Sequence, residues 1–97
     1  MYKILIFLKR TDDESVLSRF RQSTIPRLES LTGQKITLAE IEGASLSQEK
    51  FIKYCEAVFS KREDLDRLMQ TPEGKEFNKD IAGYGSYISV FYADFGE

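Results

Sequence analysis

The chain of 97 residues has no histidine, no tryptophan and a single cysteine. Without histidine, the most common general base and transition-metal ligand of proteins is missing, and a haem site with a proximal histidine is excluded. One cysteine cannot form an internal disulfide. We therefore expect no metal ion, haem or other cofactor, and any catalysis would have to use hydroxyl or carboxyl groups.

Charge and hydropathy exclude two further classes of protein. The 14 basic and 16 acidic residues give a net charge of -2, and neither half of the chain is basic enough to predict a nucleic-acid or anionic-membrane surface. There is no run of 18 apolar residues and no charged-then-apolar leader. The length of 97 residues fits a single domain over residues 1–97. The single cysteine and the lack of a leader or membrane-spanning run lead us to expect a cytoplasmic protein with no nucleic-acid or membrane partner.

Four segments have the patterns of strands. Residues 2–9 and 51–59 are short apolar runs rich in β-branched and aromatic side chains, and residues 35–42 alternate as a half-exposed edge strand does. A polar connection through residues 48–50 is short enough for a hairpin between the second and third strands. The last strand is expected at residues 86–95, which are rich in Tyr, Ile, Val and Phe.

Caps and breaks mark a first helix between the first two strands. Thr11 and Glu14 have the spacing of a capping box, which predicts that the helix begins there. Pro26 removes a backbone donor, so the helix is expected to kink near Thr24 before it ends at Gly33.

Two further helices are expected between the third and fourth strands. Ser60 and Glu63 form a second capping box, and Thr71 followed by Pro72 has the pattern of an N-cap and first helical residue. The glycines of residues 83–85 end this pair of helices.

This order of elements is that of an α+β, ferredoxin-like βαββαβ fold, in which the helices cover one face of a four-stranded antiparallel sheet whose first and third strands are central. The uncovered face would still carry apolar side chains, and exposing them would forfeit on the order of 10 kcal/mol. A second copy packed sheet against sheet would bury them, so a homodimer is expected. The predicted interface residues are Leu5, Phe7, Tyr54, Val58, Tyr87 and Phe91.

Two stretches of packing and capping residues point to a family. One is the segment from Glu56 to Ser60, followed by Leu65, Leu68, Thr71-Pro72-Glu73-Gly74 and Phe77. The other contains Val16, Phe20, Pro26, Leu28, Leu31 and Gly33. Together they resemble the EthD-like family of the dimeric α/β-barrel superfamily, whose members are small ferredoxin-like homodimers. The resemblance covers most of the chain, so we expect residues 1–97 to form one domain of this kind.

The resemblance implies a mostly apolar pocket between the helices and the sheet, suited to a small hydrophobic or aromatic molecule. Family members usually carry a histidine two residues before the helix-kinking proline, where this chain has Thr24. The Thr24 hydroxyl is therefore expected to orient a ligand and not to shuttle protons. The expected ligand-binding residues are Phe20, Thr24, Lys53, Cys55, Leu68, Phe77 and Tyr92. Simple packing of the core is the alternative explanation for each of them.

The residues themselves contain no established catalytic constellation. Asp80, just before residues 83–85, and Tyr92 are the candidates for acid–base chemistry, although Asp80 could instead bond nearby loop amides. Cys55 is expected to be an inert, buried hydrophobe, because no histidine is present to lower its pKa.

Three functions remain open on the sequence alone. The first is a homodimeric EthD-like protein that binds a small apolar or aromatic molecule. The second is a cofactor-independent monooxygenase, isomerase or cyclase-like enzyme that uses Tyr, Thr and a carboxylate. The third is a non-catalytic accessory protein whose pocket has collapsed.

Overall fold

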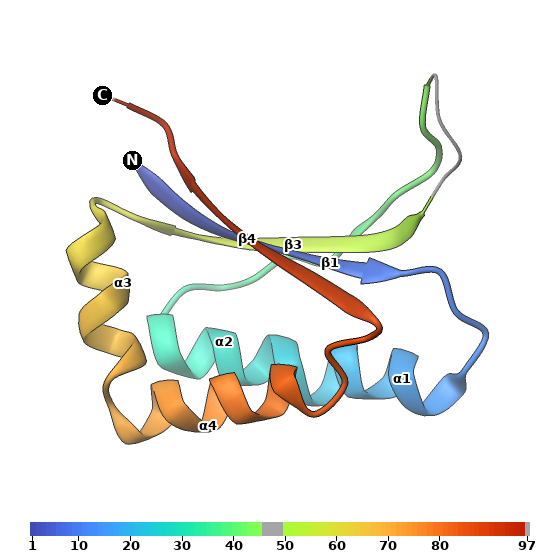
Figure 1. Cartoon of the computed structure of the whole chain (residues 1–97), viewed down its shortest axis with the longest axis horizontal. Helices are drawn as coiled ribbons and strands as arrows, with labels where there is room; N and C mark the ends of the chain where they lie inside the picture. The colour runs from blue at the N-terminus through green and yellow to red at the C-terminus, as the bar shows by residue number, and fades with distance from the viewer. Residues whose placement is uncertain (46–49, 97) are drawn as a thin grey trace.

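The computed structural model of the protein describes residues 1–45 and 50–96. Four strands and several helical segments follow one another along the chain (Figure 1). The strands are β1 (Tyr2–Lys9), β2 (Ala39–Glu40), β3 (Phe51–Phe59) and β4 (Ile88–Asp94). The α-helices are α1 (Glu14–Arg19), α2 (Ile25–Thr32), α3 (Arg62–Met69) and α4 (Pro72–Ala82), with a π-helical turn, η1 (Phe20–Thr24), between α1 and α2.

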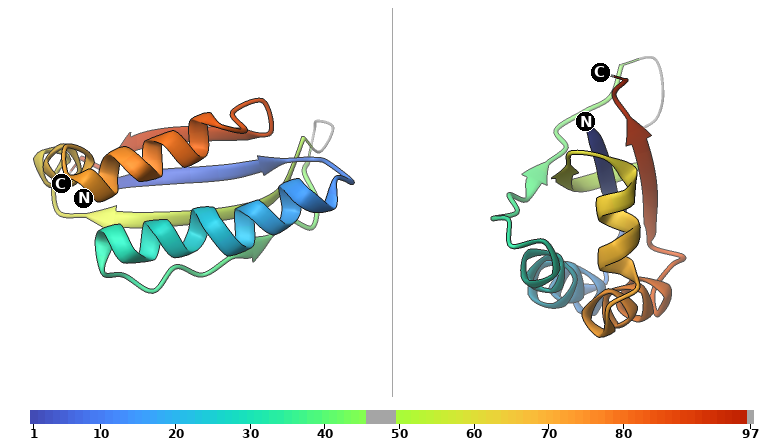
Figure 2. Two further views of the ribbon diagram at one scale, coloured as in Figure 1. Left: turned by 90° about the horizontal axis from the view of Figure 1, so that it is seen from below. Right: turned by 90° about the vertical axis from the view of Figure 1, so that its left-hand side faces the viewer.

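The sheet has the order β2-β3-β1-β4, and all of its paired strands are antiparallel. The first and third strands are therefore central, as the sequence predicts, and the α+β, ferredoxin-like fold class is confirmed. The helical run from α1 to α2 and helix α4 lie side by side on one face of the sheet, and α3 lies at one end (Figures 1 and 2). None of the helices in residues 1–45 and 50–96 covers the opposite face (Figure 2).

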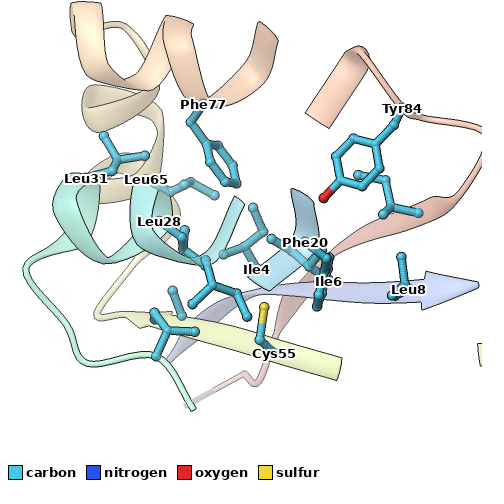
Figure 3. Packing of buried hydrophobic residues seen from close by; sticks show 14 of the residues in the cluster. Ile4, Ile6, Leu8, Phe20, Leu28, Leu31, Cys55, Leu65, Phe77 and Tyr84 are labelled. Carbon is cyan, nitrogen blue, oxygen red and sulfur yellow. The ribbon is translucent and has the colours of Figure 1, made fainter. Parts of the chain in front are cut away.

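Successive side chains of β1 point to opposite faces of the sheet. Ile4, Ile6 and Leu8 are fully buried beneath the helices. Cys55 pairs with Ile6 in the neighbouring strand, and its sulfur points toward the helical layer (Figure 3). Leu5 and Phe7 lie on the uncovered face, opposite Glu56 and Tyr54 respectively.

The first helical run is continuous, with a widened turn where the sequence predicts a kink. Ile25 keeps α-helical dihedral angles, and its N–H bonds to the carbonyl of Phe20, five residues earlier. A proline has no N–H to donate to the carbonyl four residues earlier, and its ring clashes with that carbonyl. The π-helical turn before Pro26 widens the helix at this point, so the chain continues into α2 without a break. Gly33 ends α2 with φ of 69°, as expected for a left-handed C-cap.

Two predicted N-caps are wrong, and one is right. Asp13, not Thr11, caps α1 by accepting a hydrogen bond of 2.9 Å from the Ser15 amide. Lys61, not Ser60, precedes α3, and its side chain makes no capping bond. In both cases a spacing that fits a capping box was not enough to fix where the helix begins.

Helix α4 begins as the sequence predicts. Thr71 is its N-cap and accepts a hydrogen bond from the Gly74 amide at 3.1 Å, with Pro72 in the first turn. Gly74 packs closely on the end of α3: a Cβ there would collide with the Leu68 carbonyl and lie 2.6 Å from the Met69 Cα. This glycine is therefore required by the close approach of two helices.

The second strand is much shorter than the predicted residues 35–42. Ala39 and Glu40 pair with β3, opposite Tyr54 and Lys53, and the Ile41 amide also donates to the Ile52 carbonyl of β3 at 2.9 Å. Ile36 instead turns inward to join the core, and its amide is held by the Glu29 carboxylate at 2.9 Å. β2 and β3 are antiparallel neighbours, as a hairpin requires, while residues 48 and 49 of the predicted connection lie outside the described residues. Within the described parts of the chain, no helix is long and apolar enough to cross a bilayer.

Candidate functional site

The residues expected to line a central pocket form the densest part of the core. Phe20, Phe77, Thr24 and Cys55 are each 1% exposed or less. The aromatic rings pack with Ile4 and the other apolar side chains between the helices and the sheet (Figure 3). Leu68 is partly buried against the same cluster. The structure thus gives these residues a packing role, and their ligand-binding role stays a prediction.

A polar network extends from this core toward the surface, with Thr24, Asp80 and Tyr84 buried and Arg19 and Ser23 partly exposed. We call these five residues the Asp80 network. The Thr24 hydroxyl donates to the Asp80 Oδ2 atom at 2.6 Å and also contacts the Tyr84 hydroxyl at very short range. Because Thr24 has one hydroxyl proton and gives it to Asp80, the proton between Thr24 and Tyr84 comes from the Tyr84 phenol. The three groups form a directed chain from phenol to hydroxyl to carboxylate.

Cationic groups balance the charge of Asp80. The Arg19 Nε atom bonds to Asp80 Oδ1 at 3.3 Å, and the Arg19 guanidinium also donates to the Asp80 backbone carbonyl at 2.7 Å. Ser23 donates to Oδ1 at 2.9 Å, and Arg27 lies 4.0 Å from the same oxygen. Asp80 therefore bonds to helical side chains of α1, η1 and α2, and not to the loop amides that the sequence offered as its alternative partners.

Tyr84 is neutral at physiological pH. Burial, as the largest cause, raises the pKa of this phenol to about 12. The Arg19 guanidinium lies 4.6 Å from the centre of the Tyr84 ring and makes a cation–π contact with it. In the described residues, no buried side-chain nitrogen or oxygen lacks a hydrogen-bond partner. The Asp80 network joins the first helical run to the end of α4 and to Tyr84 just after it.

Cys55 is buried beside this network and carries no activating partner. Burial, followed by the nearby Glu56 carboxylate, raises the pKa of its thiol to about 12. The thiol is therefore almost entirely protonated near neutral pH, which is the condition of a structural and not a nucleophilic cysteine.

A groove opens at one edge of the helix–sheet layer, between α4 and β4. We call it the α4–β4 groove. It encloses about 400 Å³. It is lined by Asn78, Ile81, Ala82, Gly85, Ile88 and Val90. Apolar side chains of α4 and β4 form most of this wall, and Asn78 supplies an amide. None of the predicted ligand-binding residues lines this groove, so it differs in place from the pocket that the sequence predicts.

A second hollow of about 240 Å³ adjoins the groove, since Asn78 lines both. Tyr92 and Tyr2 contribute phenol groups to it, and Arg62 and Asp66 contribute charges. Tyr92 is 51% exposed, and burial raises its pKa, with smaller effects from Tyr2 and Asp66. The predicted residue Tyr92 is thus beside open space, while Asp80, the other catalytic candidate, is enclosed in its network.

Lys53 lies in β3, on the other side of β1 from Tyr92 in β4. Its ammonium bonds to the Glu40 carboxylate at 2.6 Å across the β2–β3 pair. Because β1 separates them and they line different hollows, Lys53 and Tyr92 do not form one ligand site.

The uncovered face of the sheet carries an aromatic cluster. Phe7 is its centre, with ring centroids 4.8 Å from Tyr54, 5.2 Å from Phe51 and 5.8 Å from Phe91. Phe91 is 50% exposed and Val58 is 40% exposed. Tyr87, also predicted to lie in the interface, is partly buried against the core cluster and lies just before β4, not in the strand.

A polar network interrupts this apolar face, and the sequence did not point to it. The Lys3 ammonium lies 2.8 Å from the Glu56 Oε2 atom, and the Tyr54 hydroxyl donates to Oε1 of the same carboxylate. These bonds, the one from Lys3 first, hold the pKa of Glu56 below its ordinary value. Burial and the contact with Glu56 raise the pKa of Tyr54. Lys3 also lies 4.8 Å from the centre of the Phe95 ring.

Comparison with known proteins rests on structure. No protein-family model matches the chain, and no curated protein matches it. An ethyl tert-butyl ether D (EthD) family protein from Bacillus halodurans has a TM-score of 0.82 and 21% identity, with 99% of both chains covered. The chain has the fold of the EthD proteins. The resemblance predicted from the sequence is confirmed in the fold.

Two other solved structures share this EthD-like fold. A hydroxynitrile lyase from Passiflora edulis has a TM-score of 0.71 and 14% identity over 99% of this chain and 94% of the lyase. A dimeric ferredoxin-like protein of unknown function from Jannaschia sp. has a TM-score of 0.70 and 11% identity over 96% of this chain and 97% of that one. EthD-like folds thus occur in an enzyme and in a dimer without a known activity.

Proposed function

We propose that this protein is a homodimer that binds a small apolar or aromatic molecule in the α4–β4 groove. The observation that carries the proposal is the groove itself, which is open along an edge of the helix–sheet layer while the centre of that layer is filled. Ligand pockets are mostly apolar and contain a few polar groups that fix orientation. The α4–β4 groove has this character, with Ile81 and Val90 in its wall and the Asn78 amide at its junction with the second hollow.

The two hollows favour an elongated ligand with an apolar body and one polar end. The apolar body would lie against the side chains of α4 and β4. Its polar end would reach the Asn78 amide and the Tyr92 phenol in the adjoining hollow. The raised pKa of Tyr92 keeps this phenol protonated, so it can donate a hydrogen bond to the ligand.

The occupant that we propose for the uncovered sheet face is a second copy of the chain. Phe91 and Val58 are large, exposed apolar residues on a face that no described helix covers. A flat apolar face of this kind is typical of interfaces that resemble a core cut in half. Several proteins with the same fold, including the one from Jannaschia, are described as dimeric.

Native mass spectrometry of the purified protein, followed by identification of any bound molecule, tests ligand binding. Ala82→Trp places an indole in the groove and is expected to abolish binding of that molecule. Lys79→Trp is the matched control, because Lys79 is exposed on the same helix but does not line the groove. Equal binding by both variants would place the ligand elsewhere. Turnover of the identified molecule would add a catalytic role.

A further inference from the structure

A separate hollow lies between the first helical run and β3, on the other side of β1 from the α4–β4 groove. We call it the β3-edge cleft. It encloses about 270 Å³. It is lined by Glu14, Leu17, Ser18, Arg21, Gln22 and Lys53. These residues come from the first helical run and from β3, so the cleft is built where the helical layer meets the sheet.

Lys53 is placed differently from an ordinary surface lysine. Its side chain is 12% exposed, whereas its partner Glu40 is 64% exposed. Most of the Lys53 side chain is thus covered, while the Glu40 side chain lies largely in solvent. The bond to Glu40 uses one of three ammonium protons, and the other two can be donated to a group in the cleft.

Arg21 adds a second cation to the same cleft. Its charge, after the larger effect of Lys53, contributes to holding the pKa of Glu40 low. Across residues 1–45 and 50–96, the Arg21 guanidinium donates no hydrogen bond to another side chain or carbonyl, so its planar fork is available to an acceptor.

Gln22 is oriented as a donor. Its Oε1 atom accepts a hydrogen bond of 3.2 Å from the Ser18 hydroxyl, so its amide NH2 group is left to donate. Leu17 gives the cleft an apolar wall, and Glu14 is the one carboxylate in the lining that is described. Donors therefore outnumber acceptors, and a ligand that fits has to bring acceptor oxygens.

We propose that the β3-edge cleft binds a small organic anion, a carboxylate or a phosphate ester. Its anionic group would accept hydrogen bonds from Lys53, Arg21 and the Gln22 amide, and its apolar part would lie against Leu17. The volume is just below the roughly 300–1,000 Å³ of typical ligand pockets, so the ligand is small. This site is on the other side of β1 from the α4–β4 groove, and its existence does not depend on the proposed function.

Three probes of similar shape test the proposal: benzoate, phenyl phosphate and the neutral benzamide. Titration of the isotope-labelled protein is followed by the amide resonances in NMR spectra. We expect benzoate, phenyl phosphate or both to shift the amides of residues 17–22 and 53 with a saturable profile, and the preferred anion identifies the ligand class. Benzamide should leave these amides unmoved. Equal effects of benzamide and both anions, or no effect of either anion on these amides, would overturn the proposal.

Two substitutions are expected to change the affinity for the preferred anion in opposite directions. Arg21→Gln should weaken binding of the preferred anion about tenfold, because one charge-assisted hydrogen bond is lost. Glu40→Gln should strengthen it, because the carboxylate that competes for the Lys53 ammonium is removed. Lys75→Gln, an exposed lysine of α4 outside the cleft, is the control for net charge. If Lys75→Gln and Arg21→Gln weaken binding equally, general electrostatics explain the binding and the cleft is not the site.

Discussion

Thr24 and Asp80 are 56 residues apart in the chain and are joined by a hydrogen bond of 2.6 Å in the buried core. Thr24 is fully buried, and its hydroxyl is also in contact with the Tyr84 phenol. The bond ties the π-helical turn η1 to the last part of α4. The Thr24 hydroxyl thus joins Arg19 and Ser23 in linking the two helical runs that cover the sheet.

Thr24→Val is therefore expected to destabilise the fold by about 1–3 kcal/mol, because a buried carboxylate oxygen and a buried phenol each lose a partner. Thr24→Ser keeps the hydroxyl and should recover most of this loss. Unfolding in urea, followed by circular dichroism, measures the difference. Thr37→Val, at an exposed position, is the control and should change stability by less than about 0.5 kcal/mol. A Thr24→Val protein as stable as wild type would show that the network does not stabilise the fold.

Gly74→Ala is expected to destabilise the protein more than an ordinary glycine substitution in a helix. The new Cβ would collide with the backbone of Leu68 and Met69, and backbone cannot move aside as a flexible side chain does. Helices α3 and α4 would have to separate. Thermal unfolding should therefore show a lower midpoint for Gly74→Ala than for Gly43→Ala, where a Cβ meets nothing within 4 Å. Equal midpoints would contradict this account of the contact.

The contact between Lys3 and Glu56 predicts a pH dependence. The pKa of Glu56 is lowered in the folded protein, first by Lys3 and then by Tyr54. A carboxyl group of this kind stabilises the fold above its unfolded pKa of about 4.3, and the contribution is lost as the pH falls through the lower folded value. At a fixed protein concentration, wild type should exceed Glu56→Gln in free energy of unfolding near neutral pH.

This difference between wild type and Glu56→Gln should shrink as the pH falls below about 4. The exposed residue Glu76 supplies the control, because Glu76→Gln should show no comparable pH-dependent difference. A difference that is constant from neutral to acidic pH would mean that the charge of Glu56 does not contribute to stability.

The proposed homodimer predicts that Phe91→Asp yields a folded monomer. Phe91 is half exposed in the single chain, so the charge costs little there, but it would be buried without a partner in a sheet-to-sheet interface. Sedimentation velocity should give twice 11.2 kDa for wild type and 11.2 kDa for the variant, with an unchanged circular dichroism spectrum. Ser86→Asp, exposed just before β4, should remain dimeric. A folded wild-type monomer at micromolar concentration would rule out this interface.

Cys55 is expected to react slowly with thiol reagents in the native protein. With a pKa of about 12, its thiolate fraction near pH 8 is about a thousandfold lower than that of a free cysteine, and burial adds to the protection. Because the chain has no other cysteine, mass spectrometry of maleimide-treated protein reports this site alone. Rapid modification without denaturant would show that Cys55 is accessible, while rapid modification only in denaturant fits its burial.

The sequence by itself determined the elements whose signals are local. The apolar runs of β1 and β3 are strands over the predicted residues, and Thr71 and Gly33 mark helix ends as predicted. These features depend on neighbours within a few positions, through side-chain periodicity, capping and the freedom of glycine to adopt positive φ. The order of the elements was then sufficient to give the fold class.

The tertiary structure alone decided where open space lies and which polar groups meet. Phe20, Thr24 and Phe77 have the residue types of a pocket lining, yet packing fills the volume between them and leaves the hollows at the edges, beside Tyr92 and Lys53. No sequence pattern pointed to Arg19 or Tyr84. Arg19 acts through its contact with Asp80, 61 positions away in the chain, and Tyr84 acts through its contact with Thr24. A cavity or a buried network depends on distances between side chains remote in sequence, and only the packed chain fixes those distances.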